Sequence, residues 1–115
     1  MQELIKINQN HEFKRMYYKA KYKAHPYLVT YLVKNRRQCV RYGITATKKV
    51  GNACQRNRAR RIIEAAARIA LPEMPNGVDV IFVARKDTST VKSGDILRVM
   101  KKHLSILTTN STKKI

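Results

Sequence analysis

The chain has 115 residues, which is enough for one modest hydrophobic core and too few for two independent domains. Lys and Arg together number 25 against seven Asp and Glu, so the formal net charge is +18, and 43% of the residues are hydrophobic. This composition excludes a disordered polybasic tail and indicates a folded domain with an anionic partner, for which nucleic acid, an anionic membrane surface and a polyacidic protein are the candidates.

The first predicted element is a short helix near the N-terminus. Asn10 is a suitable N-cap, because its side chain can accept a hydrogen bond from a backbone N–H of the first turn. Phe13, Met16 and Tyr17 follow at helical spacing, with basic residues between them. The pattern predicts an amphipathic helix with aromatic rings in its apolar stripe.

Two strands are predicted next. Pro26 opens an extended run over residues 27–33, which is rich in aromatic and β-branched residues. From Val40 to Thr47, apolar and polar residues alternate with the period of two that is typical of a half-buried strand. Alternatively, part of this second stretch could form two short strands of one meander.

After a turn at Gly51 and Asn52, the period becomes helical from about Ala53 to Ala70. On a helical wheel the apolar residues gather on one side, and they are Ala59, Ile62, Ile63, Ala66, Ile69 and Ala70. The opposite side is polar and mostly basic, and it carries Arg56, Asn57, Arg60, Arg61, Glu64 and Arg68, with Arg58 at the border. An amphipathic helix with one basic face follows from this pattern.

Proline residues end this helix, and the apolar run of residues 78–84 then predicts a buried central strand. A last amphipathic helix begins near Ser93 and gives way to a flexible polar tail from about residue 108. We therefore expect a single α+β domain over residues 1–115, in which about four strands are packed by three helices in the order α-β-β-β-α-β-α.

The sharpest local feature is a basic segment between Lys48 and Arg61 that contains no acidic residue. Charge runs are usually solvated helix faces. Here, however, Arg predominates within the helix and almost no carboxylate lies one turn away, so the like charges would destabilise the helix unless an anion lay across them. The turn at Gly51 and the helix N-terminus add free backbone N–H groups, which favour phosphate. We interpret the segment as a strip of phosphate contacts.

Aromatic residues supply the second half of a single-strand RNA site, because unpaired bases stack on Tyr and Phe. Several lie among basic residues near the N-terminus, namely Phe13, Tyr17, Tyr18, Tyr22, Tyr27 and Tyr31. For any one of them, packing in the core is at least as good an explanation.

Other classes of site have little support. The three His and the acidic residues are scattered, without metal-ligand spacing or an adjacent nucleophile. Cys39 and Cys54 are too few for a disulfide framework and are interpreted as reduced thiols. With neither a membrane-spanning run nor a signal-peptide pattern, we expect a cytoplasmic protein without a membrane partner.

The segment ATKKVGNACQRNRARR, from Ala46 to Arg61, resembles the signature of the bacterial ribonuclease P protein family, whose hallmark is Lys-Lys, Gly-Asn-Ala and then Arg-Asn-Arg. The early Phe13 and Tyr17, the strand ending at Ala84 before Arg85 and Lys86, and the closing helix also fall where the family has them. The similarity covers nearly the whole chain.

The resemblance implies the protein subunit of a ribonucleoprotein endonuclease that removes the 5′ leader from precursor tRNA. Catalysis would belong to the RNA subunit and its Mg²⁺, with no cofactor bound by the protein and no obligate protein partner. The residues implied to bind the RNA subunit are Lys48, Lys49, Asn52, Arg56, Asn57, Arg58, Arg60 and Arg61. Those implied to line a cleft for the leader are Phe13, Tyr17, Tyr31, Arg60 and Arg68.

The family fold also implies a left-handed strand-helix-strand crossover, against the usual right-handed rule. At Glu64, relatives often carry a basic residue, so the extent of the leader contact is open there. Tyr27, Thr30 and Tyr31 are all candidates for the strand residue that faces the cleft, because a shift of one residue turns every side chain over, and Tyr31 is preferred.

Two other classes remain as alternatives. A ribosomal-type RNA-binding module would share the charge, although it leaves the Arg-Asn-Arg signature unexplained. An architectural DNA-binding protein should bind duplex DNA and structured RNA with comparable affinity.

Overall fold

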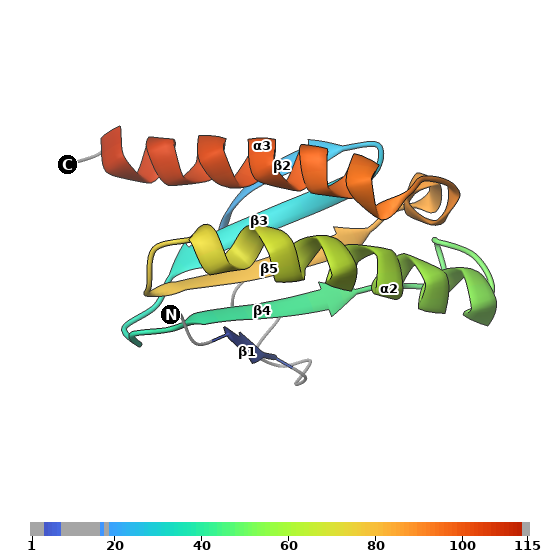
Figure 1. Cartoon of the computed structure of the whole chain (residues 1–115), viewed down its shortest axis with the longest axis horizontal. Helices are drawn as coiled ribbons and strands as arrows, with labels where there is room; N and C mark the ends of the chain where they lie inside the picture. Colours follow the sequence, from blue (N-terminus) through green and yellow to red (C-terminus); the bar gives the residue numbers. More distant parts are fainter. Residues whose placement is uncertain (1–3, 8–16, 18, 114–115) are drawn as a thin grey trace.

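The computed structural model describes residues 4–7, 17 and 19–113, which form one five-stranded sheet with two α-helices against one face (Figure 1). The elements in chain order are β1 (Leu4–Lys6), β2 (Lys21–His25), β3 (Leu28–Lys34), β4 (Val40–Thr45), α2 (Ala53–Ala70), the 3₁₀ helix η1 (Leu71–Glu73), β5 (Val78–Ala84), the 3₁₀ helix η2 (Lys86–Thr90) and α3 (Ser93–Lys113). Across the sheet the strand order is β1-β4-β5-β3-β2. The predicted α+β class is confirmed.

The sheet has five strands, so the expected count of about four is wrong. Pro26 lies in the turn of a hairpin between β2 and β3 and does not open a strand. The short strand β1 pairs in parallel with the outer edge of β4, with Leu4 opposite Val40. The strand β4 is continuous from Val40 to Thr45, so its division into two pieces is also wrong.

The described residues contain two α-helices where three were expected. The predicted N-terminal helix, with Asn10, Phe13 and Met16, lies outside the described residues except for Tyr17 and Lys19, both of which are helical. At the other end, α3 continues to Lys113, through the region expected to form a polar tail from about residue 108.

The parallel neighbours β4 and β5 are joined by α2. In Figure 1, α2 lies in front of these two strands, which both point to the right, with β5 above β4. That arrangement is left-handed, as the resemblance implied, and runs against the strong right-handed preference of such units.

The main core lies between the helices and one face of the sheet. From the sheet it takes alternate residues, namely Leu28, Leu32, Val40, Tyr42, Val78, Val80, Phe82 and Ala84. From α2 it takes mostly small residues, namely Ala59, Ile63, Ala66, Ala67 and Ala70. Ile69, predicted to face the core, is 55% exposed, because it lies about 100° around the helix from Ala70 and beyond the buried arc. None of the described helices is long and apolar enough to span a membrane.

Candidate nucleic-acid interface

The start of α2 is fixed by Gly51 and Asn52. Gly51 has a φ of +146°, and a Cβ atom there would clash with the side chain of Gln55. Asn52 is the N-cap: its Oδ1 accepts from the backbone N–H of Gln55 at 2.9 Å, while the backbone N–H of Asn52 donates to Oε1 of Gln55 at 2.8 Å. Because its side-chain oxygen Oδ1 is used in this capping box, Asn52 has a structural role. It fixes the start of the helix that carries the arginines.

Two arginines of the motif are braced against the loop that precedes α2. Nη1 of Arg56 donates to the carbonyl oxygen of Gly51 at 3.3 Å. Arg60 donates from Nη1 to Oδ1 of Asn57 at 3.1 Å and from Nη2 to the carbonyl oxygen of Ala46 at 3.2 Å. These bonds use only some of the five donors of each guanidinium, so each side chain is oriented and still has N–H groups for an anion.

The basic residues of the motif lack acidic partners within the described part of the chain. The ion pairs there use the carboxylates of Glu64, Asp79 and Asp95. None of those pairs involves the basic residues Lys48, Lys49, Arg56, Arg58, Arg60 or Arg61. Their positive charge is therefore available to a ligand.

The motif does not form one uniform face. Arg58 and Arg60 are two positions apart on α2, which places them about 160° apart around the helix axis. Arg60 lies on the side of β4, where it reaches the carbonyl of Ala46, and Arg58 lies on the other side. The exposed Arg61 lies between these two directions. The predicted strip is thus a broad convex surface around the first three turns of α2.

Glu64 forms a structural contact on the β4 side of α2. Its Oε1 lies 2.8 Å from Nζ of Lys6 in β1. Burial opposes its charge, but the hydrogen bond from Lys6, the nearby Tyr42 hydroxyl and the positive charges of Lys6 and Arg68 together outweigh burial, so the pKa of Glu64 lies below its ordinary value. Burial and the neighbouring Glu64 together raise the pKa of Tyr42 to about 12. The carboxylate therefore ties β1 and β4 to α2, and the exposed Arg68 follows it one turn later.

The other face of the sheet carries an aromatic cluster. The rings of Tyr17 and Tyr31 have centroids 4.7 Å apart at an interplanar angle of 59°, and the rings of Tyr22 and Tyr31 lie 5.4 Å apart at 31°. Burial raises the pKa of Tyr17, against a smaller lowering by Thr45. The environment of the cluster therefore favours the neutral form of this phenol.

Three residues were candidates for the strand residue that faces the leader cleft. Of these, Tyr31 is the one that lies beside Tyr17 on the open face. Thr30 is fully buried, with Oγ1 2.9 Å from Nδ1 of His103, and Tyr27 packs against the main core. The structure thus brings together Tyr17 and Tyr31 of the predicted leader cleft. Arg60 and Arg68 lie on α2, which covers the opposite face, and Phe13 lies outside the described residues.

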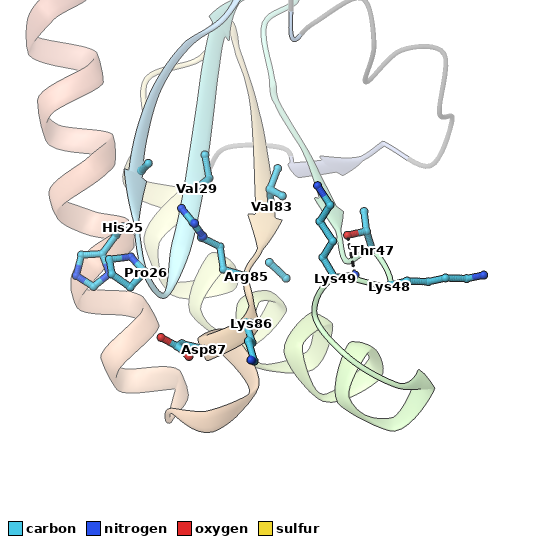
Figure 2. Close-up of a pocket in the computed structure, with 12 residues that line it drawn as sticks. His25, Pro26, Val29, Thr47, Lys48, Lys49, Val83, Arg85, Lys86 and Asp87 are labelled. Atoms are coloured by element: carbon cyan, nitrogen blue, oxygen red, sulfur yellow. Dashed lines mark hydrogen bonds between the residues drawn. The ribbon is translucent and has the colours of Figure 1, made fainter.

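A groove of about 990 Å³ continues the open face at one end of the sheet (Figure 2). Val29 and Val83 lie side by side in its floor, in the register of β3 with β5. Figure 2 shows Lys49 rising beside Val83 and Arg85 extending beside Val29, while Lys48 points away from the groove. The two basic side chains therefore flank an apolar floor.

The groove includes Arg85 and Lys86, which were not among the predicted site residues. They follow β5 directly, just as Thr47, Lys48 and Lys49 follow β4. Because β4 and β5 are parallel neighbours, the segments that follow them meet at one end of the sheet. In the sequence, the only sign of this site was a basic pair directly after a buried strand. The pair can be assigned to the groove only once the parallel pairing of β4 with β5 is known.

Within residues 4–7, 17 and 19–113, no three His, Cys, Asp or Glu side chains form a group that could hold a metal ion. Both cysteines are free, with Cys39 buried and Cys54 exposed. What the described site offers is therefore oriented cations, backbone N–H groups, aromatic rings and an apolar floor.

The family model for ribonuclease P matches residues 1–108 of the chain. The ribonuclease P protein component of Clostridioides difficile (strain 630) is 36% identical over 96 residues, which cover 83% of this chain and 84% of that protein. The RNase P protein of Staphylococcus aureus has a similar structure, with a TM-score of 0.77 at 28% identity over 90% of this chain and 95% of that one. The RNase P protein from Thermotoga maritima, at 24% identity and a TM-score of 0.71 over 84% and 96% of the two chains, supports the fold. With its basic motif, left-handed crossover and sheet in place, the chain belongs to the ribonuclease P protein family.

Proposed function

We propose that this chain binds the catalytic RNA of ribonuclease P and the 5′ leader of precursor tRNA, and so promotes endonucleolytic removal of the leader. The observation that carries the proposal is the groove of Figure 2, where Lys49 and Arg85 flank the floor of Val29 and Val83. The groove lies on the same sheet face as Tyr31. Cations for phosphates beside apolar and aromatic surface for bases are what an unpaired RNA strand requires.

The two basic surfaces have different shapes and suit different ligands. The start of α2 is convex, with Arg58, Arg60 and Arg61 pointing in different directions, which suits the backbone of a large structured RNA. The groove is concave, with a volume of about 990 Å³, which suits a single strand. We therefore assign the α2 surface, with Lys48, Asn52, Arg56 and Asn57, to the RNA subunit, and the groove with Lys49 and Arg85 to the leader.

In this division of labour the protein positions the RNA, and the hydrolysis and its Mg²⁺ belong to the RNA subunit. The side chains identified above bind phosphates, stack on bases and hold the leader in an extended path. Precursor tRNA then gains affinity over mature tRNA through its leader alone. We assign this activity to the cytoplasm.

Reconstitution with the ribonuclease P RNA tests the proposal. The purified protein should leave precursor tRNA intact, the RNA should cleave slowly at low Mg²⁺, and the two together should restore fast cleavage at the 5′ end of the mature sequence. Cleavage by the protein alone would contradict the division of labour. Equal affinity of the protein for duplex DNA and structured RNA in a competition assay would favour an architectural DNA-binding protein.

A further inference from the structure

Tyr22 is an aromatic residue on the edge strand β2. It does not line the groove, and the proposed function gives it no role. It lies opposite Tyr31 in the β2–β3 register, and the two rings are tilted by only 31°. Its exposed fraction is 60%, against 55% for Ile69 and 37% for Ile5, the other large hydrophobic residues exposed in the described part of the chain. One side of the ring contacts Tyr31, and much of the remainder faces solvent.

Folding alone does not account for so much exposed aromatic surface. Edge strands usually carry charged side chains, which discourage pairing with other chains, and the neighbours Lys21 and Lys23 follow that rule. A cross-strand contact with Tyr31 stabilises the hairpin, but a β-branched residue would do so with less exposed apolar surface.

The position of Tyr22 continues the surface already described. Ala24 is the next residue of β2 on the same face, and it lines the groove beside Val29, its partner in the register. The floor thus passes from the groove to the Tyr22–Tyr31 pair without leaving the open face. A strand of RNA held in the groove and running toward the β2 edge would reach the Tyr22 ring.

We infer that Tyr22 forms a stacking subsite for one unpaired nucleobase, which extends the leader site to the β2 edge of the sheet. This inference rests on the proposed function. The tilted rings of Tyr17, Tyr31 and Tyr22 follow one another across the open face, and a base would contact the exposed side of the Tyr22 ring. Stacking on an aromatic ring tolerates any base, so the subsite contributes affinity without selecting a sequence.

The first experiment compares Tyr22→Val, which keeps the strand propensity, with Tyr22→Phe, which keeps the ring. Reconstituted holoenzyme is titrated with precursor tRNAs of increasing leader length and with mature tRNA. Tyr22→Val should weaken binding of the long-leader precursor by about fivefold or more and leave mature tRNA binding unchanged, whereas Tyr22→Phe should stay within about twofold of the wild type.

A second measurement uses the fact that the chain contains no Trp. Tyr22→Trp introduces a single indole whose emission should be quenched by a precursor with a long leader and not by mature tRNA. Lys23→Trp is the matched control, because the adjacent residue of the same strand faces the other side of the sheet. Its emission should not depend on the leader.

The outcomes separate the inference from the function on which it rests. If wild-type holoenzyme prefers the precursor and Tyr22→Val keeps that preference at every leader length, the subsite is overturned and the proposed function stands. If wild-type holoenzyme shows no preference for the precursor, both are overturned. Equal quenching at positions 22 and 23 also overturns the subsite, because it indicates nonspecific contact.

Discussion

The two faces of the sheet are built from alternate residues of the same strands, yet they have different roles. In β5, Phe82 is fully buried under the helices, whereas Val83 lies in the floor of the groove. In β3, Thr30 bonds to His103 of α3, whereas Tyr31 belongs to the open-face cluster. One face thus forms the main core, and the other carries the groove that we propose as the leader site. Substitutions on the two faces should separate stability from binding.

The largest expected effect is on the helix-covered face. Phe82→Ala removes a fully buried ring and should lower the free energy of unfolding by about 3–5 kcal/mol. Val83→Ala, one residue away on the open face, should lower it by about 1 kcal/mol or less. Urea denaturation followed by circular dichroism measures both values. Equal losses would mean that the open face is packed as tightly as the core.

The second prediction concerns the open face at the end of the sheet away from the groove. Asp79 is 4% exposed and accepts from Arg41, with Nε to Oδ1 at 3.0 Å and Nη2 to Oδ2 at 2.7 Å, while Asn35 donates to Oδ1 at 2.6 Å. Asp79→Asn leaves the Arg41 charge poorly compensated and should cost about 3 kcal/mol of unfolding free energy. A change below about 0.5 kcal/mol would show that the contacts of Asp79 with Arg41 and Asn35 do not stabilise this end of the sheet.

The third prediction concerns binding without a loss of stability. Lys49→Gln and Arg85→Gln should each leave the free energy of unfolding within about 0.5 kcal/mol of the wild type. Each should also reduce the salt dependence of precursor tRNA binding by about one unit of slope, because one phosphate contact is lost. Lys101→Gln on α3, outside the proposed site, is the control and should leave the slope unchanged. A loss equal to that of the control would remove the groove from the RNA path.

The smallest expected effect is a pH dependence that arises on the helix-covered face. Burial, followed by the nearby His25, Lys23 and Lys102, lowers the pKa of His103 below 6.5. The folded state therefore favours the neutral ring, which is bonded to Thr30.

The unfolded chain takes up this proton at about pH 6.5, so the stabilisation is complete above that value and is lost as the pH falls toward the lower pKa of the folded state. Denaturant midpoints at about pH 7.5 and about pH 5.5 measure this change. His103→Gln should show a smaller difference between them than the wild type does. An equal difference in His103→Gln would assign the effect to another group.

The parts of the fold that the sequence predicted are those with strong local patterns. The eighteen residues of α2 have a clear helical period, and β5 is apolar at every position except Asp79. The error at Ile69 arose because a wheel built from hydrophobicity favours a large residue over a small one. Ala67 is fully buried in the main core, where its small side chain allows close approach of the neighbouring elements.

The parts that could not be predicted depend on pairing between distant segments. The strand β2 is an edge strand with exposed residues at its centre, so no apolar alternation marks it, and β1 has only three residues. Arg85 entered the site because β5 lies beside β4 in parallel. The motif around Arg58 and Arg60 was visible in the sequence, but its spread around the helix follows from the geometry of α2.

The strand β1 replaces the long edge of β4 by a much shorter one. The outer side of β4 would otherwise present unpaired backbone N–H and C=O groups, which are a template for pairing with another chain. β1 covers this edge, and the ion pair between Lys6 and Glu64 fastens it to α2. A chain with a net charge of +18 reaches high local concentrations on any polyanion that binds it. Because β1 has only three residues, the edge that it offers in turn is short, and short edge strands disfavour pairing between the sheets of neighbouring molecules.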